Sequence, residues 1–327
     1  MVFSQKRIPT TDLYFANACM CWASKIANLR CEGRNSFSNE KLIIISRKEK
    51  KNIVRRLLEY KNKIIYYIID DNLWDIETSS AIPFNYKKRL IELRDGQHAE
   101  IIKFAEAVIV PSEFLREKYQ ERGYKAFRMN PFWSEKIPDV WNFEKLNNQS
   151  PLRIGYLGTA SHVDDRNFVI QVYQGLLESR ANVELTIFGI DGINKNILKE
   201  KKIKIQKYEN WQSYRNIIRN LNFDMLLYPI LPSKFNDARS MNKIVEHAVC
   251  GGLGVYSESW EYADIVNSTR IGLTWKNDVD LWVENLTMLS RTRDFKKYAG
   301  SINDIKIINE KSRLDQIEYW SNAILKK

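Results

Sequence analysis

One short segment of the chain combines cations, an amide and a carboxylate at helical spacing. It follows an apolar run over 224–230 and contains, in order, Arg239, Ser240, Asn242, Lys243 and Glu246. Cations and the backbone amides of a helix N-terminus attract phosphate oxygens. Ser240 stands where this helix is expected to begin, and the carboxylate one turn further in can accept hydrogen bonds from the vicinal hydroxyls of a sugar. This strand–loop–helix unit therefore has the groups needed to bind a nucleotide diphosphate.

A second candidate loop follows the strand that we expect over 153–158. It contains Gly158, Thr159 and His162. In a doubly wound sheet the loops at the carboxyl ends of the strands line the ligand crevice, and small residues let backbone amides approach a phosphate closely. We therefore predict that Gly158 and Thr159 bind the same nucleotide and that His162 is a candidate catalytic residue. The alternative for His162 is a loop residue without chemistry.

Two adjacent carboxylates follow a buried strand in the first half of the chain. Asp70 and Asp71 lie in the segment IIDDNLWDI (68–76). Either carboxylate could act as a general base on a substrate hydroxyl, and we predict both as candidate catalytic residues. Two other interpretations remain open. Carboxylates of this kind also hold Mg²⁺, and an Asp in a loop often caps the next helix.

Three further residues near this strand are candidates for binding a sugar. Trp74 and Asp75 belong to the same segment, and Arg47 ends the strand expected over 42–46. Aromatic rings pack against the apolar faces of sugars, whereas carboxylates and cations hydrogen-bond sugar hydroxyls. We expect all three side chains to reach the crevice that Asp70 and Asp71 line.

Strand-like and helix-like patterns alternate along the first half of the chain. The runs at 42–46, 64–70 and 107–110 are apolar on both faces, which is typical of strands buried in a parallel sheet. A long helix is expected from about 86 to 107, and another from Ser112 as its N-cap to Gly123. This alternation predicts an α/β doubly wound sheet.

The alternation stops over 129–151, a stretch rich in Pro, Asn and Ser, and we place a linker at 141–151. It then restarts, with strands expected at 153–158, 183–189, 203–207, 224–230 and 253–257. The pattern predicts two α/β domains, at 1–140 and 152–311. A final amphipathic helix over 312–327 could pack back on the first domain.

Composition excludes several classes of protein. The 327 residues exceed one usual core, and 44% of them are hydrophobic, enough for globular domains. No window reaches the ~18 apolar residues of a membrane span, and the N-terminus lacks the apolar region of a signal peptide. Four cysteines do not suggest a disulfide framework. We expect a cytoplasmic protein.

The net charge of +11 needs an explanation, and anionic partners are one class to consider. The lysines are scattered and no motif for reading nucleic acid is present, so nucleic acid is not an expected partner. A generally basic surface is one explanation of the charge. The other is a face that rests on anionic lipid at the inner side of the cytoplasmic membrane.

The order of motifs in the second half resembles that of group 1 (family 4-type) glycosyltransferases. The motifs are YLGTASH, FD-x-LLYP, FN-x-x-RS-x-N-K-x-x-E, GGLGVYS and EYADIV, and they span roughly residues 152–275. The resemblance implies the GT-B fold, in which two Rossmann-like doubly wound domains face each other across a cleft. The second domain of that fold binds the nucleotide-sugar donor.

The resemblance also implies roles for individual residues. It places Glu246 on the ribose hydroxyls of the donor, and Arg239 and Lys243 on the diphosphate, assisted by Asn242. In many relatives an Arg and a Lys follow the first strand of this domain, and here the cation would be Arg166 or a protonated His162. Many relatives also carry a Glu eight residues before the ribose-binding one, where this chain has an alanine.

The implied activity is transfer of a sugar from a nucleotide-sugar donor to a hydroxyl of a glycan or a lipid-linked acceptor, with retention of configuration, in cell-surface polysaccharide biosynthesis. No cofactor or metal is expected, because cations and helix dipoles handle the diphosphate charge. The alternatives are another GT-B enzyme, such as a nucleotide-sugar 2-epimerase or a polyol-phosphate transferase, and a non-catalytic nucleotide-sugar-binding subunit.

Overall fold

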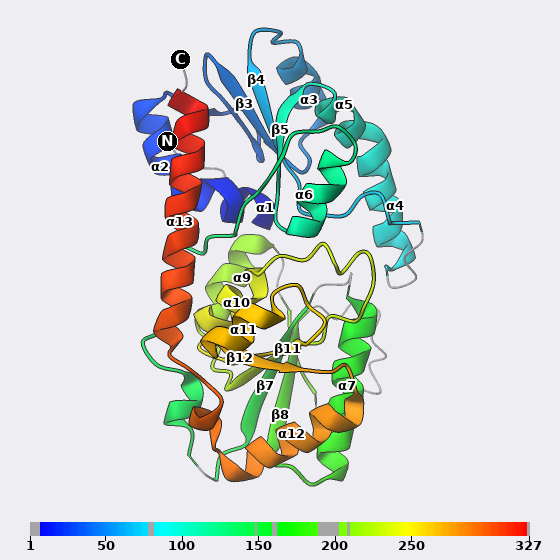
Figure 1. The fold of residues 1–327 in the computed structure, drawn as a ribbon, viewed down its shortest axis with the longest axis vertical. Coiled ribbons are helices and arrows are strands. Elements are labelled where there is room, and N and C mark those ends of the chain that lie inside the picture. Colours follow the sequence, from blue (N-terminus) through cyan, green and yellow to red (C-terminus); the bar gives the residue numbers. More distant parts are fainter. Residues whose placement is uncertain are drawn as a thin grey trace.

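The structure, a computed structural model, consists of two α/β domains stacked along the long axis of the molecule (Figure 1). It describes residues 7–77, 82–147, 149–158, 162–188, 203–207 and 210–325. Each domain is built on a six-stranded sheet with helices on both faces. The prediction of two α/β domains is confirmed.

The first sheet has its strands in sequential order. They are β1 (Arg30–Cys31), β2 (Ser36–Ser38), β3 (Leu42–Ser46), β4 (Ile64–Ile68), β5 (Ala105–Val110) and β6 (Ala126–Arg128). From β3 onward neighbouring strands are parallel, whereas β1 and β2 add an antiparallel edge. Because each parallel crossover runs in the same direction and is right-handed, the connecting helices lie on one face.

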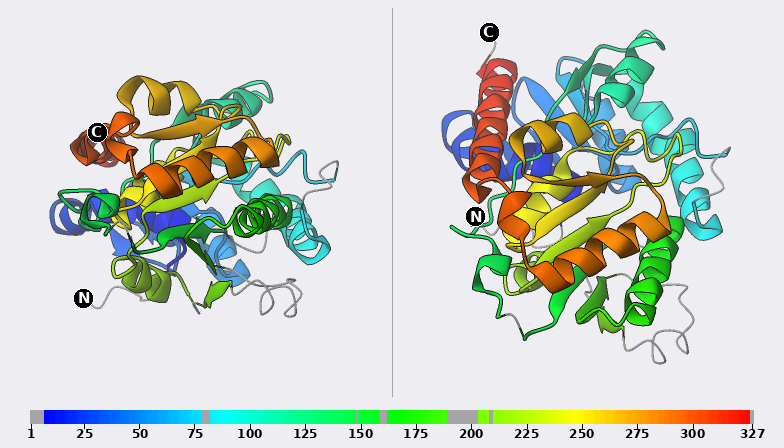
Figure 2. Two further views of the ribbon diagram at one scale, coloured as in Figure 1. Left: turned by 90° about the horizontal axis from the view of Figure 1, so that it is seen from below. Right: turned by 60° about the horizontal axis from the view of Figure 1, so that its bottom comes forward.

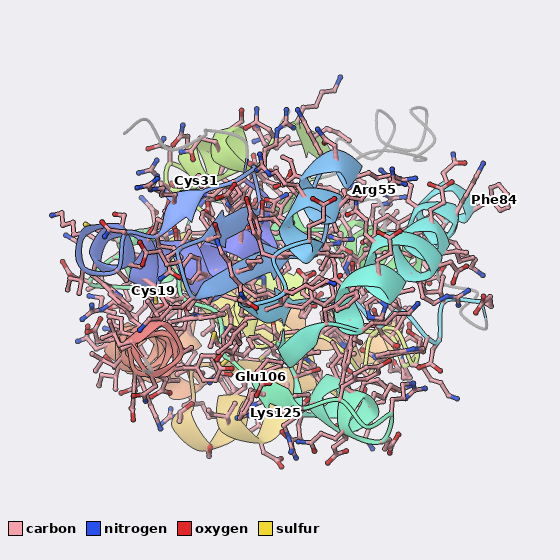
Figure 3. All side chains as sticks on the ribbon, turned by 90° about the horizontal axis from the view of Figure 1, so that it is seen from above. Cys19, Cys31, Arg55, Phe84, Glu106 and Lys125 are labelled. Carbon is pink, nitrogen blue, oxygen red and sulfur yellow. The ribbon has the colours of Figure 1, made fainter. Side chains whose placement is uncertain are left out.

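Helices cover both faces of this sheet (Figure 1). The crossover helices are α3 (Lys51–Leu58), α4 (Phe84–Leu93), the π turn η2 (Arg94–His98), α5 (Ala99–Ile102) and α6 (Glu113–Gln120). The other face is covered by both ends of the chain: α1 (Pro9–Thr11), the π turn η1 (Asp12–Ala16), α2 (Asn17–Ile26) and α13 (Ile302–Leu325). Figure 3 looks down on this domain, with α2 and α13 on one side and α4 on the other.

The sequence predicted one helix from about 86 to 107, but the structure has a kinked helix that ends at Ile102. Gly96, inside the π turn, leaves helical angles (φ −98°, ψ −107°), and a glycine tolerates such a break. The predicted N-cap is confirmed, because the Ser112 hydroxyl accepts a hydrogen bond from the Leu115 amide.

The second sheet is entirely parallel and reverses its winding direction in the middle. Its strands are β7 (Leu152–Leu157), β8 (Val183–Phe188), β9 (Lys204–Gln206), β10 (Met225–Tyr228), β11 (Leu253–Ser257) and β12 (Gly272–Trp275), in the order β12-β11-β10-β7-β8-β9. The chain leaves β7 toward one side and β10 toward the other. A ligand crevice is expected at this switch point, at the carboxyl ends of the two strands.

Two layers of helices enclose the second sheet (Figure 2). One layer is α7 (Val163–Glu178) and α12 (Val279–Thr292); the other is α9 (Trp211–Ile218), α10 (Asn242–Val249) and α11 (Ala263–Thr269). Helix α10 begins at Asn242, two residues later than the Ser240 start that the sequence suggested. It ends at Val249, and Gly251 follows in the left-handed region (φ 71°), which a glycine adopts without strain.

The stretch between the domains is packed against both of them. The Trp133 amide donates to Asn309 of α13, and its indole donates to Asn242 of α10. Short 3-10 turns, η3 (Asn142–Lys145) and η4 (Phe295–Lys297), flank the second domain. Helix α13 then runs along both domains and packs on α2 (Figure 1). Within the described ranges, no helix combines the length and the apolar character that crossing a membrane requires.

Candidate functional site

The carboxyl edges of the two sheets face each other and enclose a cavity of about 210 Å³, here the inner cavity. The first domain contributes residues that follow β3 and β4, and the second contributes residues that follow β7 and β10. Nine of the predicted site residues or their immediate neighbours meet here: Arg47, Asp70, Asp71, Leu157, His162, Arg239, Ser240, Asn242 and Lys243. The topology of the two sheets therefore brings together segments that are up to about 200 residues apart in the sequence.

Two arginines from different domains converge on one carboxylate in the inner cavity. Arg47 forms an ion pair with Asp71 and donates to the Tyr86 hydroxyl at 3.0 Å. Arg239, from the second domain, lies 3.8 Å from the other Asp71 oxygen and stacks on the Phe235 ring. Within the described part of the chain, Nε and Nη2 of Arg239 are buried without a hydrogen-bond acceptor. An anion entering the cavity would find these donors already in place.

Asp70 stands in a different environment from its neighbour Asp71. Its Oδ2 accepts a hydrogen bond from Thr10 at 2.7 Å, and its Oδ1 is buried with no hydrogen-bond partner among the described residues. Burial and the adjacent charge of Asp71 raise the pKa of Asp70, against the opposing charge of Arg47. The two carboxylates thus divide into one that pairs with arginines and one that can exchange a proton.

A second cavity of about 290 Å³, here the side cavity, adjoins the inner cavity behind α10. Glu246 lines it and is 3% exposed. One Glu246 oxygen accepts from the Tyr214 hydroxyl at 2.6 Å, and the other pairs with Lys243. Trp211 and Gly158 complete the wall, so this cavity offers a carboxylate beside aromatic rings. Such surroundings suit a ribose and a planar base.

The first turn of α10 separates the two cavities. Asn242 and Lys243 line both of them. Lys243 also donates to the Leu157 carbonyl at 2.5 Å, which holds its ammonium group at the end of β7. Ser240 precedes the helix and accepts from the Asn242 amide. The N-terminal end of α10, with its partial positive charge, therefore points at the junction of the cavities.

His162 lies at the start of α7 and lines the inner cavity. Its Nδ1 is 2.8 Å from Asp165, which also accepts from the Leu231 amide and so has a structural role. Burial and the charge of Arg239 lower the pKa of His162. A neutral imidazole is favoured, which argues against the protonated cation that the sequence suggested. Arg166 is almost fully buried in α7 and does not line the inner cavity either.

Two of the three side chains that we expected to bind a sugar beside Asp70 and Asp71 do not reach the inner cavity. Trp74 packs against Tyr119, with ring centroids 4.4 Å apart, and lines a different groove. Asp75 pairs with Lys118 of α6. The chain turns away from the cavity after Asp71, so both side chains face α6. Gly158 lines the side cavity, and Thr159, also predicted to bind the nucleotide, lies outside the described residues.

The alanine at position 238, where many proteins of the resembled family carry a carboxylate, has a packing reason. Ala238 is 1% exposed and belongs, with Phe235, to the apolar core that the helices of the first domain form on their sheet. A carboxylate here would be buried in an apolar core without a partner, which is costly. The loop before α10 thus packs into the core of the first domain. Position 238 has no carboxylate that could contact the donor.

Several cavity residues were missed by the sequence analysis. In the inner cavity, Tyr14 comes from the N-terminal segment and Tyr86 comes from α4. Thr10, also from the N-terminal segment, donates to Asp70. Trp211 and Tyr214 come from α9. No motif marks any of them, because they reach the cavities through packing between distant elements. Among the described residues, no group of three or more His, Cys, Asp or Glu side chains could hold a metal ion.

No family model and no curated protein matches the chain. The similar proteins are therefore found among solved structures. A trehalose-6-phosphate protein from E. coli, bound with UDP-2-fluoro glucose, aligns over 87% of this chain and 73% of its own, with 12% identity and a TM-score of 0.54. The apo lipopolysaccharide outer core galactosyltransferase WaaB aligns over 84% and 78%, with 15% identity and a TM-score of 0.50. These structures have two facing α/β domains, like this one. The chain has the GT-B fold.

The GT-B structures differ in length from this chain. The pneumococcal O-GlcNAc transferase GtfA, in complex with UDP and GlcNAc, aligns over 90% of this chain with 11% identity and a TM-score of 0.50, but only 63% of GtfA is covered. The chain spans 50% of the S. aureus protein TarM. At these identities the likeness concerns the fold, so substrates have to be argued from the cavities.

Proposed function

We propose that this GT-B protein is a glycosyltransferase of the family 4 type, which moves a sugar from a nucleotide-sugar donor to a hydroxyl of a glycan or lipid-linked acceptor. The observation that carries the proposal is the pair of adjoining cavities at the switch point of the second sheet. One cavity joins a buried carboxylate to aromatic rings, and the other has unpaired arginine donors facing two carboxylates. The fold shared with solved structures that hold UDP and GlcNAc or UDP-2-fluoro glucose supports the same function.

In the proposed complex the nucleoside lies in the side cavity and the diphosphate at the N-terminus of α10. Glu246 would accept hydrogen bonds from the ribose hydroxyls, with Lys243 turning from Glu246 toward the phosphates. Arg239 and Asn242 would stabilise the charge that develops on the departing diphosphate. No metal is required by this arrangement, because two cations and a helix N-terminus already face the leaving group.

The acceptor would enter from the side of the first domain. Asp70 is the better candidate for accepting its proton, because one of its oxygens has no partner in the described structure and Asp71 is engaged by Arg47 and Arg239. His162 would contact the donor sugar as a neutral hydrogen-bonding group. We also propose that the transfer retains the configuration of the sugar. The enzyme would act in polysaccharide biosynthesis, at the inner face of the cytoplasmic membrane.

The decisive experiment starts with a melting screen of the purified protein against UDP-, GDP-, dTDP-, CDP- and CMP-sugars. A bound ligand raises the melting temperature by mass action, so the donor should be identified by its shift. Donor hydrolysis or transfer is then measured with and without EDTA, and we expect EDTA to have no effect. Binding without any turnover would favour a non-catalytic subunit, and turnover that survives combined Asp70→Asn and Asp71→Asn substitution would exclude the proposed base.

A further inference from the structure

The first domain carries a groove of about 470 Å³ on its outer side, which the proposed transfer reaction does not use. We call it the outer groove; it is lined by Trp74, Arg94, Asp95, His98, Ala99, Ile102, Lys103, Arg122 and Tyr124. Its walls are η2 and α5 on one side and the end of α6 on the other. None of these residues lines the inner or the side cavity.

The kink at Gly96 shapes the outer groove. The helix changes direction there, between α4 and α5, and its π turn brings Arg94 and His98 to the groove. His98 itself is nearly buried and hydrogen-bonds the Tyr119 hydroxyl. Burial lowers the pKa of His98 to about 4, so this side chain is neutral at ordinary pH. The floor of the groove is thus a rigid set of neutral aromatic and imidazole rings.

The cation in the best position to bind a ligand is Arg122. Its guanidinium lies over the Trp74 ring at 4.4 Å, and its Nη1 donates to the Lys118 carbonyl. Among the described residues, no carboxylate pairs with Arg122. A guanidinium stacked by its face keeps its edge available for a bidentate contact with a carboxylate or phosphate.

The remaining charges leave the outer groove positive. Arg94 is already paired with Asp95 and Glu77. Lys103 is exposed, and no ion pair joins it to another described residue. Arg122 and Lys103 thus both line the groove without an ion-pair partner among the described residues, together with the aromatic residues Trp74 and Tyr124. Aromatic rings suit the apolar faces of sugars, and the two cations suit acidic groups carried by them.

We propose that the outer groove binds an acidic oligosaccharide, meaning a glycan whose units carry carboxylate or phosphate groups. The proposal extends the proposed function, because the same loop carries Asp71 into the inner cavity and Trp74 into the groove. Three residues of chain span at most about 11 Å. One acceptor glycan could thus place a hydroxyl near Asp70 while its acidic units lie in the outer groove.

The test measures binding of three probes to the full chain by calorimetry, without any donor. The probes are a galacturonic acid hexamer, a glycerol phosphate hexamer and neutral maltohexaose. We expect one or both acidic probes to bind and maltohexaose to bind at least tenfold more weakly. Arg122→Ala should weaken acidic binding roughly tenfold or more, since losing a charged hydrogen bond has at least this effect. Arg122→Lys should restore binding only in part, because an ammonium cannot form the bidentate contact.

Matched controls separate the groove from other basic surfaces. Arg55 is an exposed cation on α3 that lines none of these cavities (Figure 3), and Arg55→Ala should bind the acidic probes like the wild type. Arg239→Ala should also retain this binding while losing the nucleotide sugar, which distinguishes the groove from the inner cavity. Melting temperatures confirm that each variant is folded.

The proposal is overturned by equal binding of neutral and acidic probes, by no binding of either acidic probe, or by equal effects of Arg122→Ala and Arg55→Ala. Failure of the proposed function would look different. In that case nucleotide sugars would not bind or react, while the acidic probes would still bind and still depend on Arg122.

Discussion

At the scale of single residues, the site is organised by how each charge is compensated. Asp71 is shared by Arg47 and Arg239, and Glu246 is shared by Lys243 and Tyr214. Each pair of partners compensates a buried carboxylate in the absence of a ligand. A bound nucleotide sugar would take over some of these partners, so the free protein already holds the cations where the substrate needs them.

The assignment of Glu246 to the ribose leads to a direct prediction. Glu246→Ala should weaken nucleotide-sugar binding by roughly 1–3 kcal/mol, because a buried charged hydrogen bond is lost. Calorimetry with the donor identified by the melting screen measures this change. Glu310→Ala is the matched control, since Glu310 pairs with its neighbour Arg313 on α13 and lines neither cavity. Equal affinity of the two variants would rule out the assignment.

Asp70 makes stability depend on pH in a defined direction. Because its pKa is raised in the folded protein, the folded state binds the proton more tightly than the unfolded state does. Its contribution to stability is therefore complete below the unfolded value of about 3.9 and is lost as the pH rises through the raised pKa. Asp70→Asn, which stays neutral, should raise the free energy of unfolding at pH 7 relative to wild type.

Urea denaturation at pH 7 and at about pH 3.5, below the ordinary aspartate pKa, tests this sign. The gain from Asp70→Asn should be present at the higher pH and absent at the lower one. Asp264→Asn, at an exposed position in the first turn of α11, provides the control for removing a carboxylate charge. A gain confined to low pH would contradict the role of burial.

At the scale of elements, the donor site depends on close packing at the ends of strands. Gly158 follows β7, and a methyl group there would lie 2.2 Å from the Tyr156 ring. The Tyr156 hydroxyl in turn donates to the His162 carbonyl at 3.3 Å. The strand end, the glycine and the start of α7 are thus one packed unit, and a change in one of them moves the others.

Gly158→Ala should accordingly affect both stability and binding. We expect a loss of about 1–3 kcal/mol in the free energy of unfolding, the usual result of overpacking, together with weaker nucleotide-sugar binding. Urea denaturation and calorimetry measure the two effects. Tyr156→Phe is the comparison, because it keeps the ring and removes only one hydrogen bond, which contributes about 1 kcal/mol. If Gly158→Ala were no worse than Tyr156→Phe in both measurements, the packing argument would fail.

At the scale of the whole molecule, buried ion pairs join the two domains. Arg215 of α9 contacts Asp12 of the N-terminal π turn at 3.0 Å and also pairs with Glu135. The Trp211 indole donates to the same Asp12. These carboxylates are only 4% and 3% exposed at their side chains. The N-terminal segment, whose Pro9 and Leu13 line both cavities, is held against the second domain in this way.

Arg215→Ala should destabilise the protein strongly, by about 3–5 kcal/mol, because two buried carboxylates lose a charged partner. Arg219→Ala, one turn along the exposed side of α9, should change stability by no more than about 0.5 kcal/mol. Urea denaturation compares the two variants. A small effect of Arg215→Ala would show that the domains do not depend on this contact.

Much of the fold could be predicted from the sequence. Strands β3 and β10 appear in the sequence as apolar runs, because a strand buried on both faces has no polar alternation. A local signal also sufficed for the Ser112 cap. The helix around Gly96 was predicted as too long, since its apolar pattern continues through the kink and a single glycine inside a helix is an ambiguous signal.

The sequence by itself determined which residues carry charge next to the ends of strands, and with them the candidate donor site from Arg239 to Glu246. Only the tertiary structure decided which of these charges meet. It brought Arg47, Asp71 and Arg239 together, turned Trp74 and Asp75 away, and added Tyr214 from α9. The physical reason is that spacing along the chain sets the position of a residue on its own element, whereas partners across a cleft depend on how two sheets and their loops pack.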